Sequence, residues 1–266
     1  MLKLFQALVL LVLLLISLCS SKSNEEINKK LYTRVLEFLG TLAPGKCAGI
    51  LLNKTNSDLF SPKLSGRILP PGSFDTPSDA LEYLYGILCA IPGMAERPYT
   101  AISSQLAQLT YDAEKYLVGA EIVLQLTHNK QVTFLVFIAF DKNYALCGYD
   151  GQIRNPGLTF DQPKKTNADT IEKLCAGIQK ICTGNNTQYK NMKQCITFMT
   201  NEIPFSTYDR LDQNNVICRT LHIQLAVVAP TVHCPHVGPT GGGKCADKTS
   251  ESYYQNATYL SCAAQR

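Results

Sequence analysis

The sequence VTFLVFIAF at residues 132–140 decides the fold class that we expect for this chain. Seven of its nine residues are β-branched or aromatic, and such side chains pack well on a pleated surface. Turn-forming residues bound the stretch on both sides, at 128–130 and at 141–143. The stretch therefore predicts a long β-strand.

The neighbouring segments also indicate strands. Ile122, Leu124 and Leu126 alternate strictly within residues 116–126, and residues 102–109 and 144–149 are two further expected strands. Asp150-Gly151 is a strong hairpin signal, so we expect the chain to turn there and to return from Ile153.

Two helices are expected ahead of the strands. A polar cap and two acids at residues 23–26 start the first, and the apolar positions from Ile27 to Leu39 recur at three- and four-residue steps. Thr76 and Pro77 start the second helix as its cap and its first residue. Residues 53–73 contain three prolines and are expected to be a loop. Helices followed by an antiparallel meander predict an α+β fold.

The run from Phe140-Asp141 to Tyr149-Asp150-Gly151-Gln152-Ile153 resembles a pattern in the long strands of the NTF2-like (SnoaL-like) family. The resemblance covers roughly residues 25–160. It implies a cone in which a curved antiparallel sheet folds over the helices and encloses an apolar pocket. No catalytic residue of the family matches a position here. The side chains expected to face the pocket are Tyr83, Tyr85, Tyr116, His128, Asp141 and Tyr149.

We expect three parts in the chain: a signal peptide at 1–21, the NTF2-like domain at 22–162, and a cysteine-rich helical extension at 163–266. Helices are expected at 167–182, at 189–199, and from Asn214 or Asn215 to about Val228. The sequence HCPHVGPTGGGKC at 233–245 has the glycine and proline content of a loop, which we expect Cys234 and Cys245 to clamp. This part is similar to the tails of uncharacterised secreted proteins of microbial eukaryotes, a likeness that implies no activity.

Residues 1–21 have the lysine, apolar run and small residues of a secretory signal, with an uncleaved membrane anchor as the alternative. Beyond them an even number of cysteines predicts five disulfides in an oxidising compartment. These are Cys47, Cys89, Cys147, Cys175, Cys182, Cys195, Cys218, Cys234, Cys245 and Cys262. Sequons at Asn53, Asn185 and Asn256 are the expected glycosylation sites. The location predicted by these signals is extracellular, with no membrane contact apart from the signal segment.

A net charge of +4 with interspersed signs gives no basic stripe, so nucleic acid is excluded as an expected partner. Residues 238–245 match the spacing of a phosphate-binding loop except at Cys245, where a hydroxyl residue is required. His222, His233 and His236 could form a zinc or copper site, and the alternative is that they are structural histidines bonded to loop carbonyls. We expect no cofactor, with zinc or copper as the alternative.

These observations leave three classes of function open. We rank first a secreted, disulfide-rich glycoprotein that binds a small, partly apolar molecule in the cone. The second is an extracellular hydrolase or lyase assisted by a metal at the three histidines. The third is a structural or interaction protein of the extracellular matrix or cell surface. The sequence leaves the oligomeric state, and whether the chain is an enzyme, open.

Overall fold

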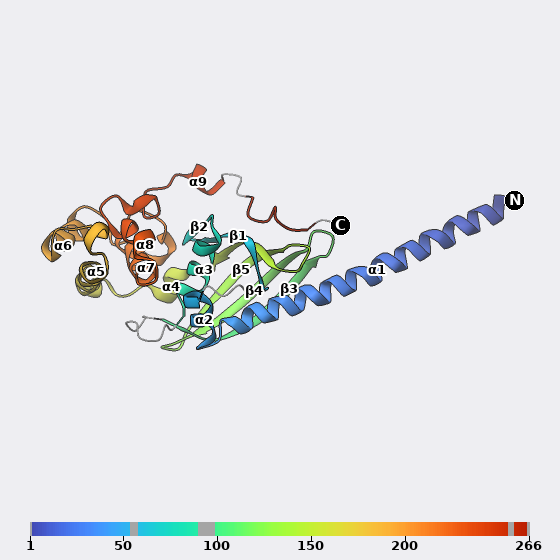
Figure 1. The fold of residues 1–266 in the computed structure, drawn as a ribbon, viewed down its shortest axis with the longest axis horizontal. Coiled ribbons are helices and arrows are strands. Elements are labelled where there is room, and N and C mark those ends of the chain that lie inside the picture. The colour runs from blue at the N-terminus through green and yellow to red at the C-terminus, as the bar shows by residue number, and fades with distance from the viewer. Residues whose placement is uncertain (1, 54–57, 90–98, 255–257, 265–266) are drawn as a thin grey trace.

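Figure 1 shows the fold in a computed structural model of the 266-residue chain. The structure describes residues 2–53, 58–89, 99–254 and 258–264. The side chains of residues 2–5, 7–22, 53 and 254 lie outside this description. Asn53 and Asn256, two of the expected glycosylation sites, fall in these undescribed parts, whereas Asn185 is exposed.

One mixed sheet forms the middle of the molecule, and the expected α+β fold class is confirmed. Its order is β2-β1-β6-β5-β4-β3; β1 and β6 pair in parallel, and the other neighbours pair antiparallel. The strands are β1 (Phe60–Leu69), β2 (Gly72–Phe74), β3 (Ala101–Asp112), β4 (Leu117–Leu126), β5 (Lys130–Phe140) and β6 (Leu146–Ile153).

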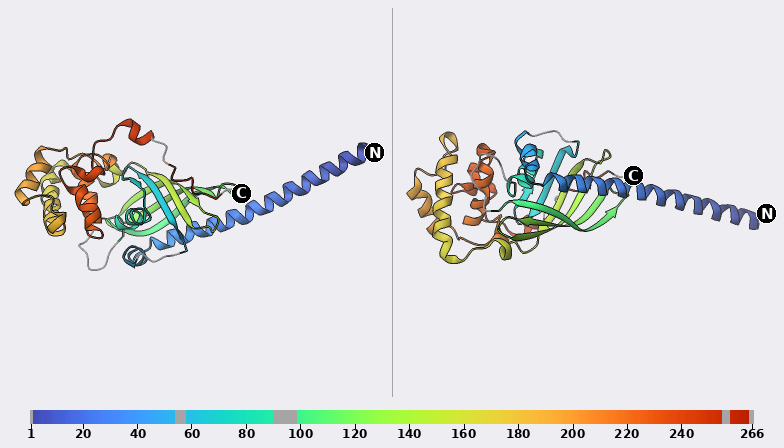
Figure 2. Two further views of the ribbon diagram at one scale, coloured as in Figure 1. Left: turned by 45° about the horizontal axis from the view of Figure 1, so that its top comes forward. Right: turned by 90° about the horizontal axis from the view of Figure 1, so that it is seen from below.

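The helices lie along the sheet and beyond one of its ends. Figures 1 and 2 show α5 to α8 gathered at one end, while the N-terminal half of α1 projects past the other. The α-helices are α1 (Leu2–Thr41), α2 (Lys46–Asn53), α3 (Pro77–Gly86), α4 (Pro156–Phe160), α5 (Asn167–Ile181), α6 (Met192–Asn201), α7 (Val216–Ala226), α8 (Pro230–Val237) and α9 (Ser250–Tyr254). Short 3-10 helices are η1 (Lys164–Thr166), η2 (Gly184–Asn186), η3 (Tyr208–Arg210) and η4 (Gly241–Gly243).

Two hydrophobic cores hold these elements together. The larger joins α1, α2 and α3 to the sheet and includes Leu221 and Leu225 from α7. The smaller lies among the C-terminal helices and includes Ile178 of α5 and Met199 of α6. Helix α7 thus contributes side chains to both cores, which places it between the sheet and the outer helices.

The first helix does not begin at residue 23 as expected, because α1 is continuous from Leu2 to Thr41. No glycine or proline occurs between residues 2 and 39, so the chain contains no residue there that would stop a helix. Among the helices whose side chains are described, no single one is both long and apolar enough to cross a bilayer. The pair Ser23–Thr41 and Lys46–Leu52, bent by 90°, meets that requirement on length and composition alone.

The expectation of a loop at 53–73 was wrong, because β1 and β2 occupy most of this segment. The expected hairpin at Asp150-Gly151 was also wrong, because both residues lie inside β6. Asp150 instead accepts two hydrogen bonds from Arg67 of the parallel strand β1, at 2.9 and 2.6 Å. A Cβ on Gly151 would lie 2.9 Å from the Leu135 carbonyl oxygen, so glycine permits the close approach of β5.

The expected five disulfides are present. They are Cys47–Cys89, Cys147–Cys262, Cys175–Cys195, Cys182–Cys234 and Cys218–Cys245. Cys234 and Cys245 are not clamped to each other, as we had expected, but to α5 and α7 respectively. The segment 233–245 is therefore tied to two different helices of the cysteine-rich extension. Such a density of disulfides is typical of an extracellular protein.

The segment 233–245 is only partly a loop. Helix α8 continues to Val237 with Pro235 inside it, which was not expected. The helix is short, so proline removes a single donor from a segment that the Cys182–Cys234 bond already fixes. The Thr76 cap of α3 was predicted correctly, and of the two caps expected for α7, Asn214 or Asn215, the structure has Asn215. Their side-chain oxygens accept from Asp79 N at 3.1 Å and Cys218 N at 2.8 Å.

One buried cation holds residues 238–245, the glycine-rich loop, in place. The Arg219 side chain of α7 is fully buried, and its guanidinium donates to the carbonyl oxygens of Gly238 (3.1 Å) and Pro239 (3.3 Å). It also donates to the Asn215 carbonyl at 3.1 Å and the Asn214 amide oxygen at 3.0 Å. Burial lowers the pKa of Arg219.

We expect Arg219→Met to lower the free energy of unfolding by about 3 kcal/mol, because buried carbonyls lose their donors. Arg154→Met is the matched control, since Arg154 is half exposed and pairs with Glu121 at 3.3 Å. It should change the unfolding free energy by less than about 0.5 kcal/mol. Urea unfolding of the two variants tests this, and equal effects would contradict the role given to Arg219.

Candidate functional site

A cavity of about 140 Å³ lies between the sheet and the helices. Its wall is apolar: apart from four tyrosines and Gln224, the described lining residues are aliphatic, phenylalanine or proline. Strand β5 contributes every second residue, namely Val132, Phe134, Val136 and Ile138. Leu135 and Phe137, which lie between them, are exposed. Alternate residues of β5 thus form one face that lines the cavity.

Two of the six residues expected at the pocket line this cavity, Tyr83 and Tyr149. The Tyr149 hydroxyl donates to the Ala80 carbonyl at 3.1 Å, so its polar end is satisfied within α3. The Tyr83 ring stacks on Phe74 with 4.0 Å between ring centroids. Its hydroxyl lies 3.2 Å from Nδ1 of His222. Burial raises the pKa of both tyrosines, so both hydroxyls keep their protons.

The other four expected residues lie outside the cavity lining. Tyr85 is buried with its hydroxyl 2.6 Å from the Thr41 hydroxyl, and Tyr116 packs on Tyr144. His128 is exposed in the turn before β5. The Asp141 carboxylate accepts from the backbone N–H groups of Asn143 and Ala145 and thereby shapes the turn before β6.

The three histidines singled out in the sequence come together in the structure. All three are buried, and each offers a nitrogen within 4.8 Å of the others. His222 comes from α7, and His233 and His236 come from α8. Nδ1 of His222 lies 3.4 Å from Nδ1 of His233 and 3.1 Å from Nδ1 of His236. We call this group the histidine cluster.

Glu82 of α3 completes the histidine cluster, and sequence reasoning missed it. Its carboxylate accepts from Nε2 of His233 at 2.8 Å, although 151 positions separate the two residues. Ser78 donates to the other carboxylate oxygen at 3.0 Å. Nothing in the helical pattern of residues 76–89 distinguishes Glu82 from an exposed acid. The signal is the contact with His233, which only the fold creates.

The glycine-rich loop covers the cluster from the other side. Gly242 adopts a left-handed conformation with φ of 53°, and a Cβ there would lie 2.7 Å from Cδ2 of His236. It would also lie 2.8 Å from the Pro235 backbone carbon. Glycine at 242 therefore serves two purposes: it permits the backbone conformation, and it lets the loop lie directly on the histidine.

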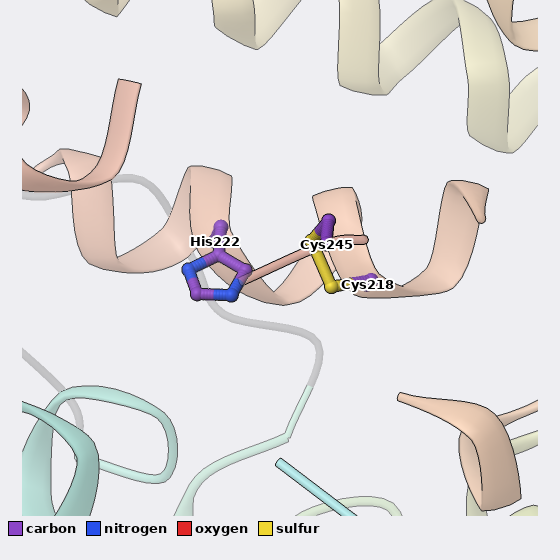
Figure 3. Close-up of side chains that lie close together, drawn as sticks. All are labelled: Cys218, His222 and Cys245. Atoms are coloured by element: carbon purple, nitrogen blue, oxygen red, sulfur yellow. A yellow bond between two sulfur atoms is a disulfide. The ribbon is translucent and has the colours of Figure 1, made fainter. Parts of the chain in front are cut away.

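The Cys218–Cys245 disulfide lies beside His222, as Figure 3 shows. Its two sulfur atoms and the imidazole are close enough to suggest a metal group of their own. The sulfurs are bonded to each other, however, and a metal requires thiolates. In the oxidised protein the disulfide fixes the loop, and the histidines are the available ligands.

Burial determines the charge state of the histidine cluster. It lowers the pKa of His236 to about 4 and that of His222 well below its usual value, with smaller contributions from the other histidines and Lys244. Both rings are therefore neutral at neutral pH. The Glu82 carboxylate accepts from Nε2 of His233, and Nδ1 of that ring faces Nδ1 of His222.

Comparison with known proteins found a family model that resembles the C-terminal part. Residues 152–248 match the BfoA family C-terminal domain. The chain is 28% identical over 214 residues to the bifonsecin B biosynthesis cluster protein A of Aspergillus brasiliensis, which covers 72% of this chain and 71% of that protein. It is 27% identical over 214 residues to the aurasperone B biosynthesis cluster protein A of Aspergillus niger, covering 72% and 69%. The chain is homologous to fungal biosynthesis cluster proteins.

A further match is short. Over 77 residues the chain is 32% identical to an EGF-like domain-containing protein of Acanthamoeba polyphaga mimivirus, which covers 28% of this chain and 15% of that protein. The segment that matches the BfoA family C-terminal domain contains all three histidines of the cluster, whereas Glu82 and Tyr83 precede it. The site is thus assembled from this domain and from a helix outside it.

Acidification should destabilise the protein through His222 and His236. The unfolded chain takes up protons on these residues below pH of about 6.5, whereas folded His236 does so only near pH 4. Stability is therefore lost as the pH falls through this window, by up to about 1.4 kcal/mol per pH unit for each histidine.

We expect His236→Gln to lose less stability than wild type between pH 6.5 and 5, by up to about 2 kcal/mol. Urea unfolding in buffers containing EDTA measures this. His128→Asn is the control, because His128 is exposed in a turn and asparagine tolerates its positive φ of 58°. This control should follow the wild-type curve. Parallel curves for wild type and His236→Gln would contradict the assignment.

Proposed function

We propose that this protein binds a small, largely apolar molecule in the cavity between the sheet and the helices. The observation that carries the proposal is an apolar cavity of about 140 Å³ with tyrosine side chains in its wall. An engineered apolar cavity of about this size takes up benzene, so there is space for one aromatic ring or an equivalent hydrocarbon group. The tyrosine rings add aromatic surface to the wall, while the hydroxyls of Tyr83 and Tyr149 bond to groups of the protein.

The relatives support a small-molecule ligand. Their names associate them with the biosynthesis of bifonsecin B and aurasperone B, and this chain covers about 70% of their length. The proposed role is to hold a product or intermediate of such a pathway away from water. The cavity has space for only part of a larger compound. The rest of such a ligand would therefore remain outside the cavity.

The NTF2-like cone and the extracellular location are parts of the same proposal. A twisted sheet that packs on α1 and α3 around an apolar cavity supports the cone. Five disulfides and the exposed Asn185 sequon support secretion and glycosylation. Secretion would place the ligand-binding step outside the cell or in the secretory pathway.

A hydrolase or lyase is the second candidate, and one observation favours it. Tyr83 contributes its ring to the cavity wall, while its hydroxyl contacts His222 of the histidine cluster. A proton-transfer group would therefore stand at the edge of the space where a substrate would lie. Turnover of a bound compound, lost in Tyr83→Phe while binding is kept, would favour this candidate over simple binding.

Val136→Phe should weaken binding of an apolar probe about tenfold or more, because the new ring occupies the cavity. Leu135→Phe is the matched control: it introduces the same ring at the adjacent, exposed position of β5. Titration with indole in a calorimeter measures the affinities, and cooperative thermal unfolding verifies the fold. Equal indole affinity in both variants would contradict binding in this cavity.

A further inference from the structure

We propose that the histidine cluster binds one divalent transition-metal ion, zinc in the first instance, through Nδ1 of His222, His233 and His236. This inference is independent of the ligand proposed for the cavity. It concerns a separate set of atoms and can be tested without any organic ligand. The cluster lies where α3, α7, α8 and the glycine-rich loop meet.

The spacing of the nitrogens fits the coordination geometry of zinc. With metal–nitrogen bonds of about 2.0–2.1 Å, tetrahedral geometry places neighbouring ligand nitrogens about 3.3–3.4 Å apart. The observed separations from Nδ1 of His222 are 3.4 Å to His233 and 3.1 Å to His236. All three residues offer a nitrogen within 4.8 Å of one another. Small side-chain adjustments therefore suffice to bring three nitrogens to one ion.

Hydrogen bonds alone do not account well for this arrangement. Nδ1 of His222 faces both Nδ1 of His233 and Nδ1 of His236, and the Tyr83 hydroxyl lies 3.2 Å from Nδ1 and 3.4 Å from Nε2 of the same ring. A neutral imidazole nitrogen either donates one proton or accepts one hydrogen bond, so Nδ1 cannot make good hydrogen bonds to both histidines. A metal ion would use the lone pairs of all three rings at Nδ1, with the ring protons on Nε2. Binding would weaken at acidic pH, because protons compete for the same lone pairs.

Glu82 provides the supporting interaction typical of metal sites. A metal-bound histidine usually donates its other N–H to a carboxylate, which fixes the tautomer and orients the ring. His233 has this arrangement, with Nε2 donating to Glu82 at 2.8 Å. Ser78 in turn donates to the carboxylate at 3.0 Å. The negative charge of Glu82 also offsets part of the charge of a buried cation.

The neighbouring charges have opposing effects. Lys244 and Lys248 contribute to lowering the pKa of His222, and their positive charge also disfavours a cation. Lys244 is held away by its bond to the Ser73 carbonyl at 2.6 Å, and Lys248 by its bond to the Lys244 carbonyl at 2.7 Å. The low pKa values of His222 and His236 keep these two ligands neutral at neutral pH. The proposed ion would therefore have three imidazole ligands and one nearby carboxylate, and no thiolate ligand.

Three protein nitrogens leave one position of a tetrahedral ion for water, which is the arrangement of catalytic rather than structural zinc sites. The Tyr83 hydroxyl lies beside His222 and can hydrogen-bond such a water. Because the Tyr83 ring also lines the cavity, the proposed ion would stand behind the cavity wall. Activation of that water would be the metal's contribution to the second candidate function.

The test uses the full chain with its disulfides intact, treated with EDTA, desalted and titrated with ZnCl₂ in a calorimeter. We expect one zinc per chain. Glu82→Gln, which acts by positioning His233, should weaken zinc binding about 10- to 100-fold. His236→Gln should abolish it, and His128→Asn should bind as wild type because it removes the only histidine outside the cluster. Indole titration of the same zinc-free samples tests the cavity separately.

A second readout depends on the wild-type chain alone. Cobalt(II) bound in place of zinc should give the strong visible absorption of a tetrahedral site, and copper(II) should show coupling to several imidazole nitrogens in its electron paramagnetic resonance spectrum. A wild-type chain that binds no zinc and gives neither spectrum would overturn the proposal. Zinc bound equally well by His236→Gln would also overturn it. These wild-type spectra decide the matter even if the His236 variant fails to fold.

Discussion

A buried carboxylate constrains how the two parts of the molecule meet. Glu82 lies in α3, which packs with the sheet, and its charge is removed from water. A buried charge is tolerated only when it is paired and hydrogen-bonded, and the His233 imidazole of α8 supplies that partner. The contact joins α8 to α3. His236 lies on the same helix as His233 and is therefore brought near α3 by the same contact.

The C-terminal part is built to hold α8 and its loop in that position. Pro235 and the glycines give this segment little helical or strand preference of its own. The Cys182–Cys234 bond attaches α8 to α5, and Cys218–Cys245 attaches the loop end to α7. Arg219 then fixes the loop carbonyls from inside. Order in the loop thus comes from cross-links and one buried cation, not from local propensity.

Sequence patterns within a few residues predicted the elements whose structure depends on neighbouring residues. The β-branched and aromatic content of residues 132–140 predicted β5, the caps at Thr76 and at Asn214 or Asn215 predicted the starts of α3 and α7, and the even cysteine number predicted five disulfides. Two of the failures involve partners distant in the sequence. Asp150-Gly151 has the sequence of a turn, but Asp150 pairs with Arg67 of the parallel strand β1 inside the sheet. Cys234 and Cys245 flank one loop in the sequence, but Cys234 bonds to Cys182 at the end of α5.

The candidate site follows the same division. Histidine content suggested a cluster, and the fold brought the three rings together, but Glu82 could not be found because its helix pattern is that of any amphipathic segment. Tyr83 was predicted as a pocket residue, and its second contact, to His222, was not. That second contact joins the cavity to the cluster through a single side chain. A cavity ligand that moves the Tyr83 ring would change the affinity of the cluster for the proposed ion. Because linkage between two binding sites is reciprocal, the ion would change the affinity of the cavity for the ligand by the same factor.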